Sequence, residues 1–151
     1  METSVIATNK RAGIKYELFE KLETGIELKG TEVKSLRLHH ADLKDSFARV
    51  EKSEVILYQF QISPYEKGSY NNVEPCRPRR LLLHRREISR LSGKMAQRGF
   101  TLIPLSVYFN SRGKVKVQLA VGKGRRVHDQ REKIKKREME QQLRKAVSLR
   151  R

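Results

Sequence analysis

The end of the chain cannot join a hydrophobic core, which limits any compact fold to the residues before it. Residues 123–151 contain 12 Lys and Arg against 4 Asp and Glu, with no aromatic residue and no proline. Apolar side chains are sparse there, although Met139, Leu143 and Val147 recur at the i, i+4, i+8 spacing of a helix. We therefore predict a basic tail that is disordered when free and helical on a polyanionic partner.

The preceding residues suffice for one domain with a single core. The 151-residue chain has a formal net charge of +17, of which the tail carries +8 (12 minus 4). This imbalance points to nucleic acid or an anionic membrane surface as the partner. Three parts are expected: a flexible N-terminal arm over residues 1–12, a folded domain over 13–122 and the tail over 123–151.

A membrane is the weaker of these two partners. No apolar run approaches the roughly 20 residues that span a bilayer, and the first residues lack the order of a secretory signal. The single cysteine, Cys76, cannot form an internal disulfide, which fits a cytoplasmic protein.

Short strands dominate the expected domain. The clearest alternation of apolar and polar side chains covers residues 114–121. Other strands are expected over residues 16–28, 46–50, 55–62, 79–84 and 102–109. Helices are expected after Thr31, as N-cap, and over residues 85–98, and residues 63–78 read as a surface loop.

Special backbone positions complete this expectation. Gly25 should interrupt or bend the first strand, Pro104 should lie at an edge or bulge, and residues 122–124 should form a flexible hinge. Several antiparallel strands with one interposed helix favour a mainly β fold with helices, namely a closed barrel of the oligonucleotide-binding (OB) type. An open α+β sheet is the alternative.

No catalytic, metal or cofactor motif is recognisable. The four histidines show no ligand spacing, and neither a nucleophile motif nor a phosphate-binding glycine motif occurs. The chain is therefore not expected to be an enzyme or to carry a cofactor. A small ribonuclease using His84 or His128 as acid and base is a rival hypothesis.

Clustered cations instead supply potential phosphate ligands. They are Lys10, Arg11, Arg77, Arg79, Arg80, Arg85, Arg86, Lys114, Lys116 and the tail. Four rings could stack on unpaired bases, those of Tyr16, Tyr65, Tyr70 and Tyr108. A merely solubilising surface would mix the two signs of charge more evenly, so RNA binding is favoured.

Five segments carry a family resemblance, namely GTEVKSLR (residues 30–37), DLKDS (42–46), ISPYE (62–66), RPRRLLL (77–83) and HDQRE (128–132). Together they resemble the small protein B family, the SsrA-binding proteins of bacterial trans-translation. These segments follow the order found in the family, and the match runs from Asn9 to about Glu138.

The resemblance implies an OB-type barrel that binds the transfer RNA-like part of transfer-messenger RNA and delivers it to ribosomes stalled on messages without stop codons. It implies no catalysis. The residues that it places on the RNA-binding face are Asn9, Tyr16, Glu23, Leu83 and Lys116. Lys10 and Arg11, two of the clustered cations, are added to this expected site.

For the tail, the resemblance implies entry into the vacant messenger path and decoding centre of the small ribosomal subunit. The matching residues are Arg125, Arg126, His128, Asp129 and Arg131. Gln130 stands where the family commonly has Lys, which removes one phosphate contact. The expected partners are transfer-messenger RNA and the small subunit with its ribosomal RNA, with elongation factor Tu a further candidate through the RNA. We expect a monomer; a ribosomal protein or general RNA chaperone is the alternative.

Overall fold

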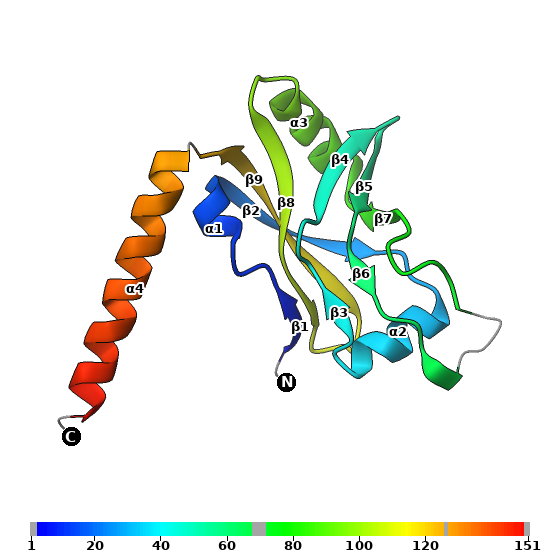
Figure 1. Cartoon of the computed structure of the whole chain (residues 1–151). Helices are drawn as coiled ribbons and strands as arrows, with labels where there is room; N and C mark the ends of the chain where they lie inside the picture. The colour runs from blue at the N-terminus through cyan, green and yellow to red at the C-terminus, as the bar shows by residue number, and fades with distance from the viewer. Residues whose placement is uncertain (1–2, 68–71, 126, 150–151) are drawn as a thin grey trace.

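The computed structural model describes residues 3–67, 72–125 and 127–149 (Figure 1). Its elements are β1 (Ser4–Thr8), α1 (Ala12–Lys15), β2 (Tyr16–Ile26), α2 (Gly30–Arg37), β3 (Ala41–Asp42), β4 (Phe47–Glu51), β5 (Glu54–Tyr58), β6 (Gln61–Ile62), β7 (Arg79–Leu82), α3 (Arg85–Met95), β8 (Phe100–Phe109), β9 (Val115–Gly124) and α4 (Val127–Leu149). The expected mainly β architecture with helices is confirmed.

Six strands pair in a closed order. The antiparallel pairs run β8-β4-β5-β7-β2-β9, and β9 pairs again with β8. The order therefore returns to the strand on which it began, which an open sheet does not do. Assignment of this ring to the OB type remains a prediction.

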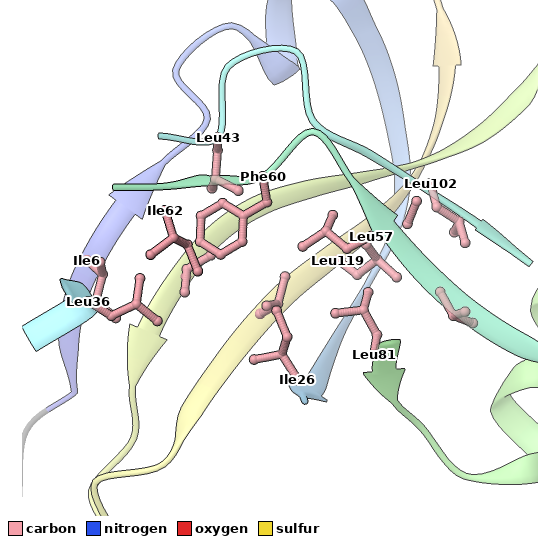
Figure 2. Close-up of a cluster of buried hydrophobic side chains, with 14 of the residues drawn as sticks. Ile6, Ile26, Leu36, Leu43, Leu57, Phe60, Ile62, Leu81, Leu102 and Leu119 are labelled. Carbon is pink, nitrogen blue, oxygen red and sulfur yellow. The ribbon is translucent and has the colours of Figure 1, made fainter. Parts of the chain in front are cut away.

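The core lies inside the ring (Figure 2). In β9, Val117, Leu119 and Val121 are fully buried on one face, as the predicted alternation requires. Leu36 of α2 and Leu91 of α3 are also fully buried, so both helices pack against this core. Figure 1 shows these two helices at opposite ends of the sheet.

The N-terminal segment differs from the predicted arm. Ser4–Thr8 forms β1, which pairs antiparallel with β8. The reason is that Ile6 is buried and joins the core, while the neighbouring backbone groups pair with β8. Residues 3–12 are therefore not an arm without regular structure.

Two glycine predictions concern the strands. β2 is not interrupted at Gly25, and the prediction of a hinge at residues 122–124 was wrong because β9 continues through them. In both places another chain segment approaches closely, so an added side chain would force its neighbour to shift by a few tenths of an ångström. A Cβ on Gly25 would lie 3.2 Å from the Leu82 Cβ, and one on Gly122 would lie 3.2 Å from the Tyr16 Cβ.

The bulge in β8 was predicted from its residue types, whereas the bulge in β2 was not. β8 bulges between Pro104 and Ser106, as expected for a strand proline. β2 bulges at Phe19, between Leu18 and Glu20, which the sequence did not reveal. The α2 helix begins two residues earlier than predicted, with Lys29 instead of Thr31 as its N-cap.

The tail forms one helix, α4, beyond the end of β9. The described side chains from Arg131 to Ser148 are all exposed, and Met139, Leu143 and Val147 are among them. The Arg137 guanidinium donates to the Lys10 carbonyl at 3.1 Å. Within the described ranges, no helix combines the length and apolar character needed to cross a bilayer.

Candidate RNA-binding face

The β2 bulge sets which side chains point outward from the ring. Tyr16 pairs with Gly124 before the bulge, and Glu23 pairs with Gln118 after it. Gly124 and Gln118 lie an even number of positions apart, so they share a face of β9, opposite to the buried core face. Tyr16 and Glu23 lie an odd number of positions apart in β2, so only the extra residue brings them to the same outer face.

Glu23 is held on this face by Tyr108. The Tyr108 hydroxyl donates a hydrogen bond to Glu23 Oε2. Because β9 lies between β8 and β2, the Tyr108 side chain spans the middle strand, and Lys116 is its direct pairing partner there. Burial, followed by the hydrogen bond and the negative charge of Glu23, raises the pKa of Tyr108 to about 12. Tyr108 therefore remains a donor at neutral pH.

Three of the residues predicted to bind RNA line one open groove of about 930 Å³. Glu23, Leu83 and Lys116 come from β2, the end of β7 and β9, and Lys114 also lines the cavity. Leu83 is half-buried against the core. This Glu23 groove, which Arg80, Glu54 and Glu87 also line, thus combines carboxylate acceptors, an apolar surface and cations that include the two lysines, a set suited to sugar, base and phosphate.

The predicted residues near the N-terminus lie elsewhere. Asn9, Lys10 and Arg11 line a cavity of about 510 Å³ that shares no described lining residue with the Glu23 groove. Asn9 is anchored to the β8 bulge, since its Nδ2 donates to the Pro104 carbonyl at 3.2 Å and its backbone N–H to the Leu105 carbonyl at 2.8 Å. Tyr16 shares a further cavity with Asn9. The structure therefore divides the predicted site into two positions.

Arg79 is not available to phosphate, contrary to prediction. It is 1% exposed, and its Nε donates to Glu32 Oε2 at 2.6 Å. Arg77 donates to the other oxygen at 2.5 Å, and the Lys29 backbone N–H donates to that oxygen at 2.8 Å. Burial alone would raise the pKa of Glu32, but these hydrogen bonds lower it below its ordinary value. The conspicuous GTEVKSLR segment therefore supplies a structural carboxylate.

Among the other predicted cations and rings, some contact other residues of the protein and some are exposed. Arg80 pairs with Glu27 at 2.8 Å on the surface, whereas Arg85 and Arg86 are exposed on α3. The Lys34 ammonium lies 5.6 Å from the centre of the Tyr65 ring. Tyr70 lies outside the described residues.

The tail residues are described only in part. Arg125 Nε donates to the Tyr16 carbonyl at 3.3 Å, and Arg131 is exposed. Arg126 lies outside the described residues, and His128 and Asp129 lie in α4 with side chains that are also outside them. Gln130, the departure from the family pattern, donates to the Arg125 carbonyl at 3.2 Å, linking α4 to the end of β9. Across the described side chains, no group of three or more His, Cys, Asp or Glu could hold a metal ion.

Comparison with known proteins gives consistent matches. A family model described as "SmpB protein" matches residues 6–149. The SsrA-binding protein of Caldicellulosiruptor bescii is 58% identical over 97% of this chain and 92% of the relative. That of Thermosipho melanesiensis is 54% identical over 93% and 95%, respectively. A solved structure described as "tmRNA-SmpB: a journey to the center of the bacterial ribosome" superimposes with a TM-score of 0.68 and 51% identity over 84% of this chain and 92% of that chain.

Proposed function

The chain belongs to the SmpB protein family, and on that premise we propose that it binds the transfer RNA-like domain of transfer-messenger RNA and delivers it to stalled ribosomes. The Glu23 groove is the observation that carries this proposal. Glu23, Leu83 and Lys116 are distant in sequence, and each was implied at the RNA by resemblance alone, yet they line one cavity. The protein acts there as a binding module of OB type and not as an enzyme.

Each group in the groove has a distinct task. Lys114 and Lys116 neutralise backbone phosphate, which positions the RNA without reading its sequence. Glu23 accepts a hydrogen bond from a base or from a ribose 2′-hydroxyl, and Tyr108 holds its carboxylate in place. Leu83 offers an apolar surface to a sugar or base.

The tail acts on the ribosome. Arg125, Arg126, His128, Asp129 and Arg131 contact ribosomal RNA of the small subunit at the decoding centre, with α4 along the vacant messenger path. The exposure of α4 and the +8 charge of residues 123–151 support this role. The protein acts as a monomer, and elongation factor Tu is reached through the bound RNA.

A competition titration tests the proposal. The full chain is titrated against labelled transfer RNA-like domain and against an unrelated hairpin of equal length, over a series of salt concentrations. The logarithm of each affinity should fall linearly with the logarithm of salt, with the transfer RNA-like domain preferred throughout. Equal affinities would favour a general RNA chaperone, and cleavage of the label would favour a ribonuclease.

A further inference from the structure

A second ordered cluster lies on the outer face of the ring, on β4 and β5. Phe47 pairs with Tyr58 across the two strands, and their rings stack with centroids 5.4 Å apart and an interplanar angle of 20°. The Arg49 guanidinium lies 5.2 Å from the Phe47 centroid and 6.0 Å from that of Tyr58. The Tyr58 hydroxyl donates to Glu51, with 2.7 Å to each carboxylate oxygen. The two rings and the guanidinium are thus fixed before any ligand arrives.

These side chains point away from the core. Ala48, between Phe47 and Arg49, is buried and pairs with the fully buried Leu102 of β8. Its two neighbours in β4 therefore face outward, where Arg49 is exposed and Phe47 half-buried. A stacked aromatic pair covered by an arginine at the surface is not required by the core.

A cavity of about 280 Å³ is lined both by this cluster and by Tyr16. Its lining includes Phe47 and Arg49 of β4, Asn9 and Tyr16, and Thr101 of β8. Gly124 of β9 is the pairing partner of Tyr16, and a Cβ added to Gly124 would meet nothing within 4 Å. Gly124 therefore places no side chain beside Tyr16.

The lining matches one unpaired nucleotide. Aromatic rings and arginine planes stack on bases of any identity, which is the usual way that proteins hold single-stranded RNA. Lys15 also lines the cavity, with its ammonium 3.7 Å from Asp45, and Lys10 and Arg11 line the adjoining one. Cations at the rim would meet the phosphates on either side of an inserted base.

We propose that the cavity between Tyr16 and the Phe47–Arg49 cluster holds one unpaired base of the bound RNA, stacked against these side chains. The assignment rests on the proposed RNA-binding function and adds Phe47, Arg49 and Tyr58 to it. It also accounts for the division of the predicted site, because Glu23 and Tyr16 would then contact different parts of one RNA.

Arg49→Gln in the full chain tests the stacking, with Arg112→Gln as a control for charge. Both arginines are exposed, and Arg112 lies in the turn between β8 and β9. Loss of one base stack should weaken binding of the transfer RNA-like domain about ten- to a hundredfold, whereas Arg112→Gln should weaken it only through salt-dependent charge. Phe47→Leu should reproduce the Arg49 effect, with thermal melting confirming that it folds.

A fluorescent base analogue supplies a readout of stacking that does not depend on the charge of the variant. With 2-aminopurine placed in turn at each unpaired position of the RNA, one position should be quenched by the wild-type chain and by Arg112→Gln, but not by Phe47→Leu. If no position is quenched, or if both arginine variants bind equally, the base slot is wrong while the Glu23 groove is unaffected. If the wild-type chain fails to prefer the transfer RNA-like domain, but Arg49→Gln still weakens binding of a short unpaired RNA, the slot stands and the proposed function fails.

Discussion

Residues 1–122, which include nearly all of the ring, and the tail over residues 123–151 carry nearly equal positive charge but use it differently. Residues 1–122 have a net charge of +9 (17 minus 8), against +8 for residues 123–151. In the ring, a cation such as Arg79 is buried against Glu32, while Lys116 opens onto a groove. Along α4, the described side chains from Arg131 onward are all exposed. Charge therefore indicates a polyanionic partner for both regions, but only the fold of the ring determines which cations can reach it.

Removal of α4 gives the largest expected effect and separates the two regions completely. Truncation after Arg125 leaves β9 and every ring pairing intact, because β9 ends at Gly124. Peptide tagging on stalled ribosomes should be abolished, while the melting temperature and the preference for the transfer RNA-like domain persist. Tagging in a reconstituted translation system measures this. Full tagging by the truncated protein would contradict the proposal that the ring binds RNA and α4 acts on the ribosome.

Glu32→Ala should destabilise the ring strongly. It leaves the buried Arg79 guanidinium without its counter-charge, which costs about 3–5 kcal/mol of unfolding free energy. Glu27→Ala removes an exposed pair with Arg80 and should cost about 0–1 kcal/mol. Denaturant titration of both variants provides the comparison, and equal losses would mean that burial does not distinguish the two pairs.

The same pair should make the ring sensitive to acid. The folded-state pKa of Glu32 is lowered from 4.5, so its stabilising contribution is complete above that pH and is lost as the pH falls through the folded value. Glu32→Gln should flatten this part of the profile of unfolding free energy against pH. An unchanged slope in the variant would assign the acid sensitivity to other carboxylates.

Glu23→Ala should affect RNA binding without affecting the fold. Loss of a hydrogen bond to a charged acceptor costs about 1.5–3 kcal/mol, or roughly ten- to a hundredfold in affinity. Glu17→Ala is a matched control, because it removes the same charge from an exposed position of the same strand. If binding and melting are both unchanged for Glu23→Ala, the residue does not belong to the site.

Tyr108→Phe should have the smallest effect, because it keeps the ring and removes only the donor to Glu23. The bond to the charged carboxylate supports the fold, but Tyr108 acts on the RNA only through the Glu23 side chain that it orients, so RNA binding should weaken less than in Glu23→Ala, by roughly two- to tenfold. The folded pKa of about 12 exceeds the ordinary value of 10, so the stabilising contribution is present below pH 10 and is lost as the pH rises toward 12. In addition to Tyr58, whose pKa is also raised by its hydrogen bond to Glu51, ultraviolet titration should show a tyrosine that ionises near pH 12 and that the variant lacks. If that tyrosine persists in the variant, Tyr108 does not hold Glu23.

Sequence patterns predicted the structural features that depend on residues close together in the chain. The alternation in β9 identified its buried face, and the placement of Pro104 in a bulge followed from its missing N–H group. The helix over residues 85–98 is present as Arg85–Met95. These features need only local chemistry and a period of apolar residues.

Features that depend on distant residues were not predictable in this way. Arg79 looked like a phosphate ligand because the distance between Glu32 and Arg79 along the sequence does not reveal that the two side chains meet in the fold. Tyr108 likewise looked like a stacking ring, but its hydroxyl is committed to a carboxylate on another strand. The one usable signal for the β4 cluster was the alternation of Phe47, Arg49 and Glu51 along a single strand face.

The bulge at Phe19 bears on how sequences of this kind can diverge. Substitution of Phe19 by another residue leaves the number of positions in β2 unchanged, so Tyr16 and Glu23 keep their common face. Deletion of that position would remove the extra residue and rotate one side of the strand relative to the other, since side chains alternate with a period of two. An alignment gap between Leu18 and Glu20 should therefore be far rarer than any amino-acid replacement there. The length of this short segment is under tighter constraint than its composition.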